Sequence, residues 1–294
     1  MNKPTIYALG FFDGVHLGHQ ALLTACRELA DRHGCAAGAV TFTAHPDGTV
    51  SGNAPALLTT TEDRRKLLYA YGMEQVVELP FDRALMTMHW RDFIRMLQGA
   101  PYRAEGFVCG NDFRFGHKGE GTAEILKQYC RAEGMPYAIV PEQILDGQRI
   151  SSTHIRSLLA EGNAEKARRF LGYPYTLSGK VVSGKQLGRT IGVPTANVLL
   201  PEGLLAPRFG VYACKVTVDG EVYPAVTNIG IRPTVSGEGV TVEVHLLDFA
   251  GNLYGRELSV AFYKFLRPEQ KFANLDALKM QITEDITQVR TIFK

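Results

Sequence analysis

Near the start of the chain lies the segment Gly10-Phe11-Phe12-Asp13-Gly14-Val15-His16-Leu17-Gly18-His19. An apolar run, Ile6–Phe12, leads into it and is typical of a buried strand. An amphipathic pattern, His19–Arg32, leads out of it with apolar residues at helical spacing. A strand that breaks at glycines and continues as a helix is typical of α/β folds, in which ligands bind at the ends of strands.

Two histidines, His16 and His19, stand at the start of that expected helix. Unpaired N–H groups and the positive end of the helix dipole favour an anion there. Gly14 and Gly18 leave room for phosphate oxygens to approach the backbone. The histidines could merely cap a helix, but the buried strand and the Phe-Asp-Gly turn before them favour a phosphate site suited to nucleotidyl transfer.

The composition limits which classes of protein this chain can belong to. The chain has 294 residues, enough for two domains, and 45% of them are apolar. Lys and Arg (32) nearly balance Asp and Glu (30), and neither half has a basic excess, so nucleic acid is not an expected partner. Five scattered cysteines without a CxxC pair predict reduced thiols, a cytoplasmic location and no structural zinc. The sequence shows neither a signal-peptide pattern nor an apolar run long enough to span a membrane.

Up to about residue 170, short apolar runs alternate with helical patterns. The expected strands are Ile6–Phe12, Ala37–Phe42, Gln75–Leu79, Gly106–Cys109 and Tyr137–Val140. The expected helices are His19–Arg32, Thr61–Tyr71, Trp90–Leu97, Glu120–Glu133 and Thr153–Ala160. This alternation predicts a Rossmann-like domain over residues 1–171, with a parallel sheet covered on both faces.

From about Gly172 the pattern changes to strands joined by turns, including the hairpin signal Asp219-Gly220. The expected strands are Tyr175–Val182, Gly210–Val218, Glu221–Thr227, Val240–Phe249 and Glu257–Phe265. A last helix is expected from the spacing of Leu275, Leu278, Ile282, Ile286, Val289 and Phe293. Residues 172–294 therefore predict a small antiparallel β-barrel, closed or half-closed, with a terminal helix. The overall fold class is α/β followed by a barrel domain.

Three more segments of the first half carry polar groups near expected strand ends or a helix start. They are Thr41-Phe42-Thr43-Ala44-His45-Pro46, Gly110-Asn111-Asp112-Phe113-Arg114-Phe115-Gly116 and Arg149-Ile150-Ser151-Ser152-Thr153-His154-Ile155-Arg156. His45 serves either packing or catalysis, and the sequence leaves both open. Ser152 or Thr153 alone would be read as a helix N-cap. The flanking Arg149 and Arg156 favour a clamp for a pyrophosphate leaving group.

Together these four segments resemble the FMN adenylyltransferase half of the bifunctional riboflavin kinase/FAD synthetases of bacteria. The resemblance covers the whole first domain, through Gly-x-Phe-Asp-Gly-x-His-x-Gly-His, Thr-Phe-x-x-His-Pro, Gly-x-Asp-Phe-x-Phe-Gly and Ser-Ser-Thr-x-Ile-Arg. It implies that His16 and His19 stabilise the transition state, and that Asp112 lies where nucleotide and flavin meet. It also implies that the β,γ-phosphates of ATP are held by Arg149, Ser152, Thr153 and Arg156.

Two positions depart from the family pattern. His154 stands where members often carry arginine, and Ala44 where a proline or an acidic residue is frequent. Neither position has an implied chemical role. The His154 difference would weaken phosphate binding if the usual side chain contributes charge, and the sequence does not decide this.

A glycine-rich stretch, residues 179–197, opens the second half without being a Walker motif. Gly184, Lys185 and Gly188 suit a loop that folds over phosphates, although glycines alone are also typical of a surface loop. Thr195 and Asn197 offer hard oxygen ligands two residues apart, which Mg²⁺ prefers together with phosphate oxygens and water.

Glu243 lies in a strand whose other face carries alternating valines. Most such glutamates are simply solvated, but a carboxylate beside a flavin hydroxyl could take its proton during phosphoryl transfer.

The second half resembles the riboflavin kinase domain from about Gly172 to the C-terminus. The resemblance is carried by Pro194-Thr195-Ala196-Asn197, Asn228-Ile229-Gly230-Ile231-Arg232-Pro233-Thr234, Val242-Glu243-Val244-His245 and Phe265-Leu266-Arg267-x-Glu269-x-x-Phe272. It implies a small β-barrel in which Thr195 and Asn197 meet Mg–ATP. It further implies that Glu243 is the general base and that Arg267 lies in a loop on the flavin side.

Two halves of one known enzyme, in the family's order, predict a bifunctional enzyme. The barrel would phosphorylate riboflavin with ATP to give FMN, and the first domain would adenylylate FMN with ATP to give FAD, both with Mg²⁺. The alternatives are an enzyme with one inactive half, a flavin- or nucleotide-binding regulator, and a nucleotidyltransferase acting on another phosphate. No membrane is expected as a partner, and the sequence does not reveal the oligomeric state.

Overall fold

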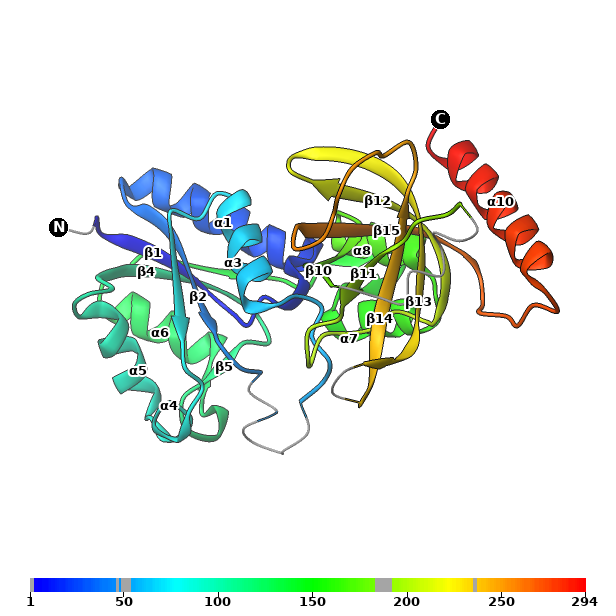
Figure 1. Ribbon diagram of the computed structural model, residues 1–294. Coiled ribbons are helices and arrows are strands. Elements are labelled where there is room, and N and C mark those ends of the chain that lie inside the picture. The colour runs from blue at the N-terminus through cyan, green and yellow to red at the C-terminus, as the bar shows by residue number, and fades with distance from the viewer. Residues whose placement is uncertain (1–2, 46–47, 49–53, 183–191, 235–236) are drawn as a thin grey trace. The chain divides into compact units, whose positions relative to one another are not determined.

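The computed structural model describes residues 3–45, 48, 54–182, 192–234 and 237–294, and the side chains of residues 232–238 lie outside this description. The chain forms two compact units, Met1–Ser152 and Thr153–Lys294 (Figure 1). Within the described ranges, no helix combines the length and the apolar character needed to cross a bilayer.

The first unit is built on a five-stranded sheet with the order β3-β2-β1-β4-β7. All four strand pairs are parallel, which confirms the predicted sheet. Its strands are β1 (Thr5–Leu9), β2 (Ala36–Phe42), β3 (Gln75–Leu79), β4 (Ala104–Gly110) and β7 (Tyr137–Val140). Two small hairpins accompany it, β5 (Arg114–Phe115) with β6 (Gly121–Thr122) and β8 (Ile144–Leu145) with β9 (Gln148–Arg149).

Helices cover both faces of this sheet. They are α1 (Leu17–His33), α3 (Thr61–Ala70), α4 (Arg83–Thr87), α5 (Trp90–Gln98) and α6 (Ala123–Ala132), with short 3-10 turns η1 (Asp13–Val15) and η2 (His117–Gly119). Alternate residues of β1 enter different cores, because side chains alternate across a strand. Ile6 and Ala8 pack with α1 and α3, whereas Tyr7 and Leu9 pack with α5 and α6.

The strand order reverses at β1, since the chain goes first to β2 and β3 and later returns to β4 and β7 on the other side. In open parallel sheets, ligands bind at the carboxyl ends of the strands beside such a reversal. The turn at Asp13–Val15 lies just there, between β1 and α1. The topology therefore places the histidine segment where a ligand site is expected.

The second unit begins with α7 (Ser152–Ala160) and α8 (Ala164–Leu171) and is dominated by a closed barrel, β10-β11-β14-β13-β12-β15. The barrel strands are β10 (Tyr175–Val182), β11 (Ala196–Leu199), β12 (Gly210–Val218), β13 (Glu221–Thr234), β14 (Gly237–Leu246) and β15 (Glu257–Arg267). Antiparallel pairing of β10 with β15 closes the ring, which confirms the predicted barrel. The sequence did not predict β11, and it predicted β13 shorter than observed.

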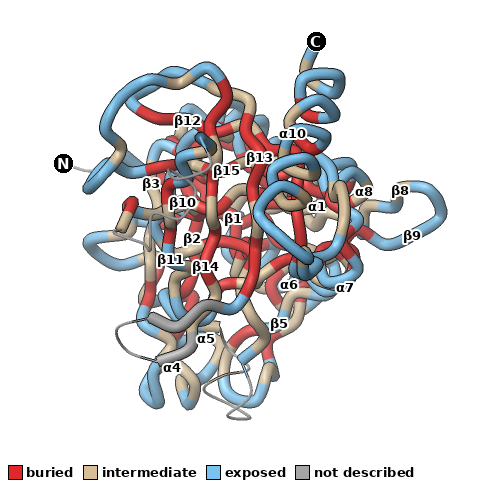
Figure 2. The backbone as a smooth tube through the Cα atoms, turned by 45° about the vertical axis from the view of Figure 1, so that its right-hand side comes forward, coloured by how far each residue is buried: buried red, intermediate tan, exposed pale blue. Residues whose placement is uncertain are grey.

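The terminal helix α10 (Leu275–Ile292) covers part of the outer face of the barrel, as predicted. Its Val289 joins Val211, Ala213 and Val226 in a core outside the strands, whereas Tyr212 and Cys214 alternate with them and are fully buried. Burial follows the strands, and α10 is exposed over most of its length (Figure 2).

Helix α8 packs against β10 and β15 of the second unit. It buries Ala164, Ala167, Phe170 and Leu171. This burial explains why the compact units divide at residues 152 and 153, whereas the pattern of motifs led us to expect the domain boundary at residues 171 and 172.

Candidate active sites

The turn after β1 is held by the carboxylate of Asp13, which is buried with 2% of its surface exposed. Its Oδ1 accepts hydrogen bonds from the backbone N–H groups of Leu58 (2.8 Å) and Thr59 (3.2 Å). The N–H of Gly14 donates to the Thr59 hydroxyl (3.2 Å), and the Ser152 hydroxyl donates to the Asp13 carbonyl (2.9 Å). Asp13 therefore organises the loop before α3 and is not free to act as a base.

The backbone of this turn is unusual. Phe12 has φ 59° and Val15 has φ 33°, although neither is a glycine, and Gly14 between them has φ 75°. Left-handed conformations at bulky or β-branched residues cost about 1–3 kcal/mol each and are concentrated at functional sites. The hydrogen bonds of Asp13 offset this strain, so the turn is kept in one shape.

The two histidines lie together at the start of α1, as predicted. His16 is the N-cap, and its Nδ1 accepts a hydrogen bond from the backbone N–H of His19 (3.3 Å). The rings are stacked, with centroids 3.7 Å apart and planes 12° from parallel. A Cβ at Gly18 would lie 3.2 Å from the His16 ring, so glycine permits this close packing. His16 thus caps the helix, and the two imidazole rings lie side by side at its N-terminus.

Burial, and after it the charges of His16 and Arg64, lowers the pKa of His19 well below its usual value. His19 is therefore neutral near pH 7, with one nitrogen that donates and one that accepts. Its buried Nδ1 has no hydrogen-bond partner among the described residues. His19 as a whole is half-buried, and a neutral imidazole at a helix N-terminus is suited to donate an N–H to an anion without being protonated first.

Arg64 of α3 is completely buried, and the sequence did not mark it as a site residue. One of its Nη atoms donates to the Phe42 carbonyl at the end of β2 (2.6 Å), and its guanidinium lies 4.4 Å from the centre of the Phe11 ring. Phe11 in turn packs edge-on against His45, with centroids 4.7 Å apart. Arg64 thus places a positive charge behind the histidine segment. A basic residue four positions before Leu68, on the apolar face of α3, was the signal that could have revealed it.

The other predicted phosphate residues fall into two groups. Arg149 pairs with the carboxylates of Asp112 and Glu142, the latter at 3.1 Å, so two predicted site residues are in contact. In the second unit, Arg156 donates to the Thr153 hydroxyl at 3.4 Å. The departing residue His154 packs edge-on against Phe170, with centroids 4.8 Å apart.

Strand register in the barrel brings together the residues predicted for phosphoryl transfer. Asn197 on β11 is directly opposite Glu243 on β14. On its other side, Glu243 is directly opposite Asn228 on β13. Opposite residues of antiparallel strands share a face, with Cβ atoms about 4.5–5.5 Å apart. Roles were predicted from the sequence for Asn197 and Glu243 but not for Asn228, although Asn228 lies in one of the motifs, because pairing between distant strands cannot be read from local pattern.

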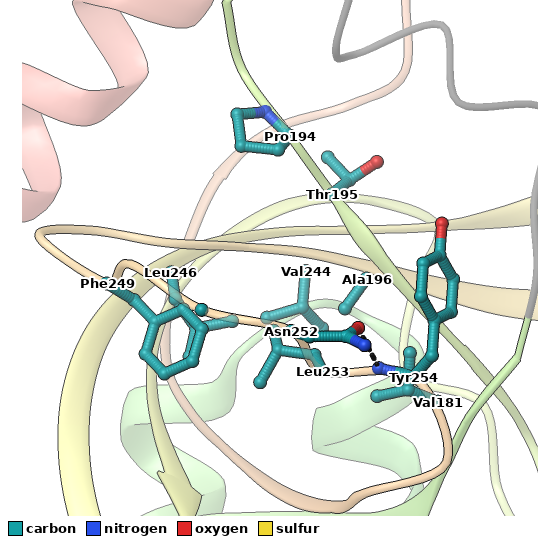
Figure 3. Close-up of a pocket in the computed structure, with 11 residues that line it drawn as sticks. Val181, Pro194, Thr195, Ala196, Val244, Leu246, Phe249, Asn252, Leu253 and Tyr254 are labelled. Carbon is teal, nitrogen blue, oxygen red and sulfur yellow. Dashed lines mark hydrogen bonds between the residues drawn. The ribbon is translucent and has the colours of Figure 1, made fainter.

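A pocket lies at the start of β11, beside Thr195 (Figure 3). Its lining residues are Val181, Pro194, Thr195, Ala196, Val244, Leu246, Phe249, Gly251, Asn252, Leu253 and Tyr254. His245 Nδ1 donates to the Pro194 carbonyl (2.8 Å), and Asn252 accepts from the backbone N–H of Tyr254 (3.0 Å), which fixes both sides. Most of the lining residues are apolar, and Thr195, Asn252 and Tyr254 add polar side chains to the wall. Such a pocket is suited to a flat ring that carries polar groups.

Two other sets of residues were predicted to act in the barrel. Gly184, Lys185 and Gly188 lie outside the described residues. Arg267, expected on the flavin side, forms a two-pronged ion pair with the buried Asp285 of α10, at 2.7–3.2 Å. The described residues contain no cluster of three or more His, Cys, Asp or Glu side chains placed to hold a metal. Oxygen ligands at Thr195 and Asn197 fit Mg²⁺ brought by nucleotide phosphates.

Comparisons with known proteins match these two units in turn. The FAD synthetase family model matches residues 1–154, and the riboflavin kinase family model matches residues 171–293. A crystal structure from Streptococcus pneumoniae, described as a macrolide-efflux protein, superposes with a TM-score of 0.88 at 30% identity. The match covers 99% of this chain and 95% of that one, so the whole architecture is shared.

Curated relatives cover nearly the whole chain. Proteins from Listeria monocytogenes (37% identity; 98% of this chain and 92% of the relative), Pseudomonas fluorescens (38%; 99% and 94%) and Escherichia coli K12 (40%; 98% and 92%) are all named bifunctional riboflavin kinase/FMN adenylyltransferases.

The parallel-sheet unit matches an adenylyl-transferring family and the barrel matches a kinase family, so the chain is a transferase of phosphorus-containing groups with two different domains. Identity of 37–40% over almost the full length makes the assignment specific. The chain belongs to the bifunctional riboflavin kinase/FMN adenylyltransferase family.

Proposed function

We propose a division of the family's two activities between the two parts of the chain. The protein phosphorylates riboflavin with ATP to give FMN and ADP, and then transfers AMP from a second ATP to FMN to give FAD and pyrophosphate. We assign adenylyl transfer to residues 1–171 and riboflavin phosphorylation to residues 172–294. The observation that carries this division is the succession of two family matches, over 1–154 and 171–293.

In adenylyl transfer, an oxygen of the FMN phosphate attacks the α-phosphorus of ATP. A new P–O bond forms, the bond to the oxygen bridging to the β-phosphate breaks, and pyrophosphate leaves. The attacking oxygen is already anionic, so no general base is needed. His16 and His19 donate to the α-phosphate as its charge develops, with help from the N-terminus of α1, where Gly14 and Gly18 allow close approach.

The remaining residues of this site would hold the two substrates. Arg149, Ser152, Thr153 and Arg156 clamp the β,γ-phosphates, and Asp112 lies between nucleotide and flavin. The ion pairs of Arg149 with Asp112 and Glu142 are half exposed, and such pairs are weak in water. A phosphate can therefore replace one of these partners at small cost.

In riboflavin phosphorylation, Glu243 accepts the proton of the ribityl hydroxyl while its oxygen attacks the γ-phosphorus of ATP. The bond to the β,γ-bridging oxygen breaks, and ADP leaves. The pocket beside Thr195 receives the nucleotide base, and Gly184, Lys185 and Gly188 contact its phosphates. Arg267 serves the flavin side by holding its loop to α10.

Mg²⁺ would be held by Thr195 and Asn197 together with phosphate oxygens, where it would neutralise charge between anionic reactants. We also propose the cytoplasm as the compartment, because the five cysteines are all free thiols.

Purified protein supplied with riboflavin, ATP and Mg²⁺ tests the assignment by chromatography of the products. We expect FMN to appear first and FAD to follow. FMN alone would establish the alternative of an inactive first half, and FAD made only from added FMN would establish an inactive barrel. Absence of any flavin product would refute both activities. Omitting Mg²⁺ in the presence of a chelator should stop both steps.

A further inference from the structure

A row of polar side chains crosses the outer face of the barrel at Glu243. The register is Asn197–Glu243–Asn228 over β11, β14 and β13. All three residues are partly buried, whereas Val242 and Val244, which flank Glu243 on its strand, face the barrel interior and are fully buried. Asn228 is therefore as close a neighbour of the proposed base as the proposed metal ligand Asn197 is.

Asn228 is held by a residue from outside the barrel strands. Its Nδ2 donates to Oε1 of Glu269, at 3.0 Å. Gly230 lies two residues along β13, on the same face, and a Cβ there would stand only 2.4 Å from the same Oε1. The carboxylate of Glu269 thus lies over β13 beside Asn228, and glycine at position 230 leaves the space that it occupies.

The loop that carries Glu269 is anchored on both sides. Just before it, Arg267 forms the ion pair with Asp285, whose side chain is only 1% exposed. A further N–H of Arg267 donates to the Pro268 carbonyl (3.3 Å), and its guanidinium lies 5.7 Å from the centre of the Phe272 ring. Glu269 is therefore presented to Asn228 by a fixed support, and the helix α10 contributes to that support through Asp285.

We propose that Glu269 is a positioning residue for riboflavin phosphorylation, and that it acts through Asn228. Only the NH₂ of the Asn228 carboxamide can face a carboxylate, so Glu269 fixes which way the amide points. The Oδ1 of Asn228 is then turned away from the loop and accepts a hydrogen bond from a hydroxyl of the polyol chain of the substrate, next to Glu243. This inference rests on the proposed role of Glu243.

The test uses the full-length protein and measures kcat and KM for riboflavin and for ATP. Glu269→Ala should raise KM for riboflavin or lower kcat so that kcat/KM falls about tenfold, while KM for ATP stays within about twofold. Glu269→Gln keeps an acceptor oxygen and should restore kcat/KM to within about threefold of wild type. The matched control is Glu221→Ala, an exposed glutamate in the β12–β13 hairpin, which should match wild type.

Gly230→Ala offers a second route to the same displacement. Its new Cβ should push the Glu269 carboxylate aside and reproduce the loss seen for Glu269→Ala, without removing the residue. In the Glu269→Ala background the same change should add little, because the displaced group is already gone. Adenylylation of supplied FMN belongs to the first unit and should not change in any variant, whereas the unchanged KM for ATP in phosphorylation reports that the barrel is folded.

The outcomes separate this inference from the assignment on which it rests. If Glu243→Gln retains full kinase activity, the proposed base is wrong and this inference falls with it. If Glu243→Gln is inactive but Glu269→Ala equals wild type, only the role of Glu269 is refuted. Equal losses for Glu269→Ala and Glu269→Gln, with Gly230→Ala unaffected, would also refute it. The inference is supported if kcat/KM for riboflavin falls in Glu269→Ala and recovers in Glu269→Gln. It also requires that the effects of Glu269→Ala and Gly230→Ala do not add in the double variant.

Discussion

The two proposed sites of this protein differ in how far their central groups are buried. In the first unit, the groups around the histidine segment are buried: Arg64 is 0% exposed, Asp13 2% and His16 6%, whereas Arg149 and Asp112 are exposed. In the barrel, Glu243 is partly exposed on the outer face of β14, whose inner face makes the core, and Thr195, just before β11, is exposed. We infer that chemistry and folding are coupled in the first site and separable in the second.

The largest effect is expected for His19→Ala. Loss of a neutral donor at the developing phosphate charge should lower FMN adenylylation about a thousandfold. Riboflavin phosphorylation in the same sample should stay near the wild-type rate and serves as an internal reference. His33→Ala, at an exposed position at the end of the same helix, is the matched control. A joint loss of both activities would contradict the division into two sites.

Glu243→Gln is the corresponding change in the barrel. Removal of a general base should lower riboflavin phosphorylation about a hundredfold, with adenylylation of supplied FMN unchanged. Because Glu243 lies outside the barrel core, the denaturation midpoint should stay the same, which would sharpen the contrast with the first site. Glu257→Gln, an exposed glutamate on β15, is the control. Unchanged phosphorylation would remove Glu243 as the base.

Asp13→Asn tests the coupling in the first site directly. The change removes the charge that accepts two backbone N–H bonds and leaves a buried NH₂ to be satisfied, which should destabilise the first unit by about 2 kcal/mol. Hydrogen exchange of the Leu58 and Thr59 amides should accelerate, because both donate to Asp13. Adenylylation should fall with it. Asp31 is exposed on α1, and Asp31→Asn should change neither the amide exchange nor the adenylylation rate. Unaltered exchange would show that Asp13 does not hold the loop.

The contrast also explains what the sequence could predict. The parallel sheet, the barrel, the terminal helix and the histidine pair all follow from local periodicity or from one contiguous segment, and the structure confirms them. Asp13 was visible within the first segment, but its partners Leu58 and Thr59 lie 45 and 46 residues away. Local pattern carries no information on such a distant hydrogen bond.

Arg64 and Asn228 were missed for related reasons. An arginine in an amphipathic helix is usually solvated, and only tertiary packing makes Arg64 a fully buried charge. Asn228 and Glu243 alternate correctly on their own strands, but their adjacency depends on the register of β13 and β14. Register between two strands is fixed by the whole barrel, so single-strand patterns cannot supply it.

The smallest effect concerns pH and again separates the two units. The pKa of His19 is lowered in the folded protein, mainly by burial. Below about pH 6.5 the unfolded chain therefore binds a proton that the folded chain does not, so the stability of the first unit falls as the pH falls. The first unit should therefore be less stable at pH 5.5 than at pH 7.5.

The free energy of unfolding of wild type and His19→Gln, measured with denaturant at pH 7.5 and 5.5, gives the contribution of His19. That contribution is the difference in pH dependence between the two proteins. His19→Gln should lose less stability on acidification than wild type, whereas His33→Gln, at an exposed position, should follow wild type. Identical pH dependence in wild type and His19→Gln would mean that the folded imidazole takes up its proton as easily as the unfolded one. The first site would then be as open to water as the barrel face, and the coupling of chemistry to folding would be lost.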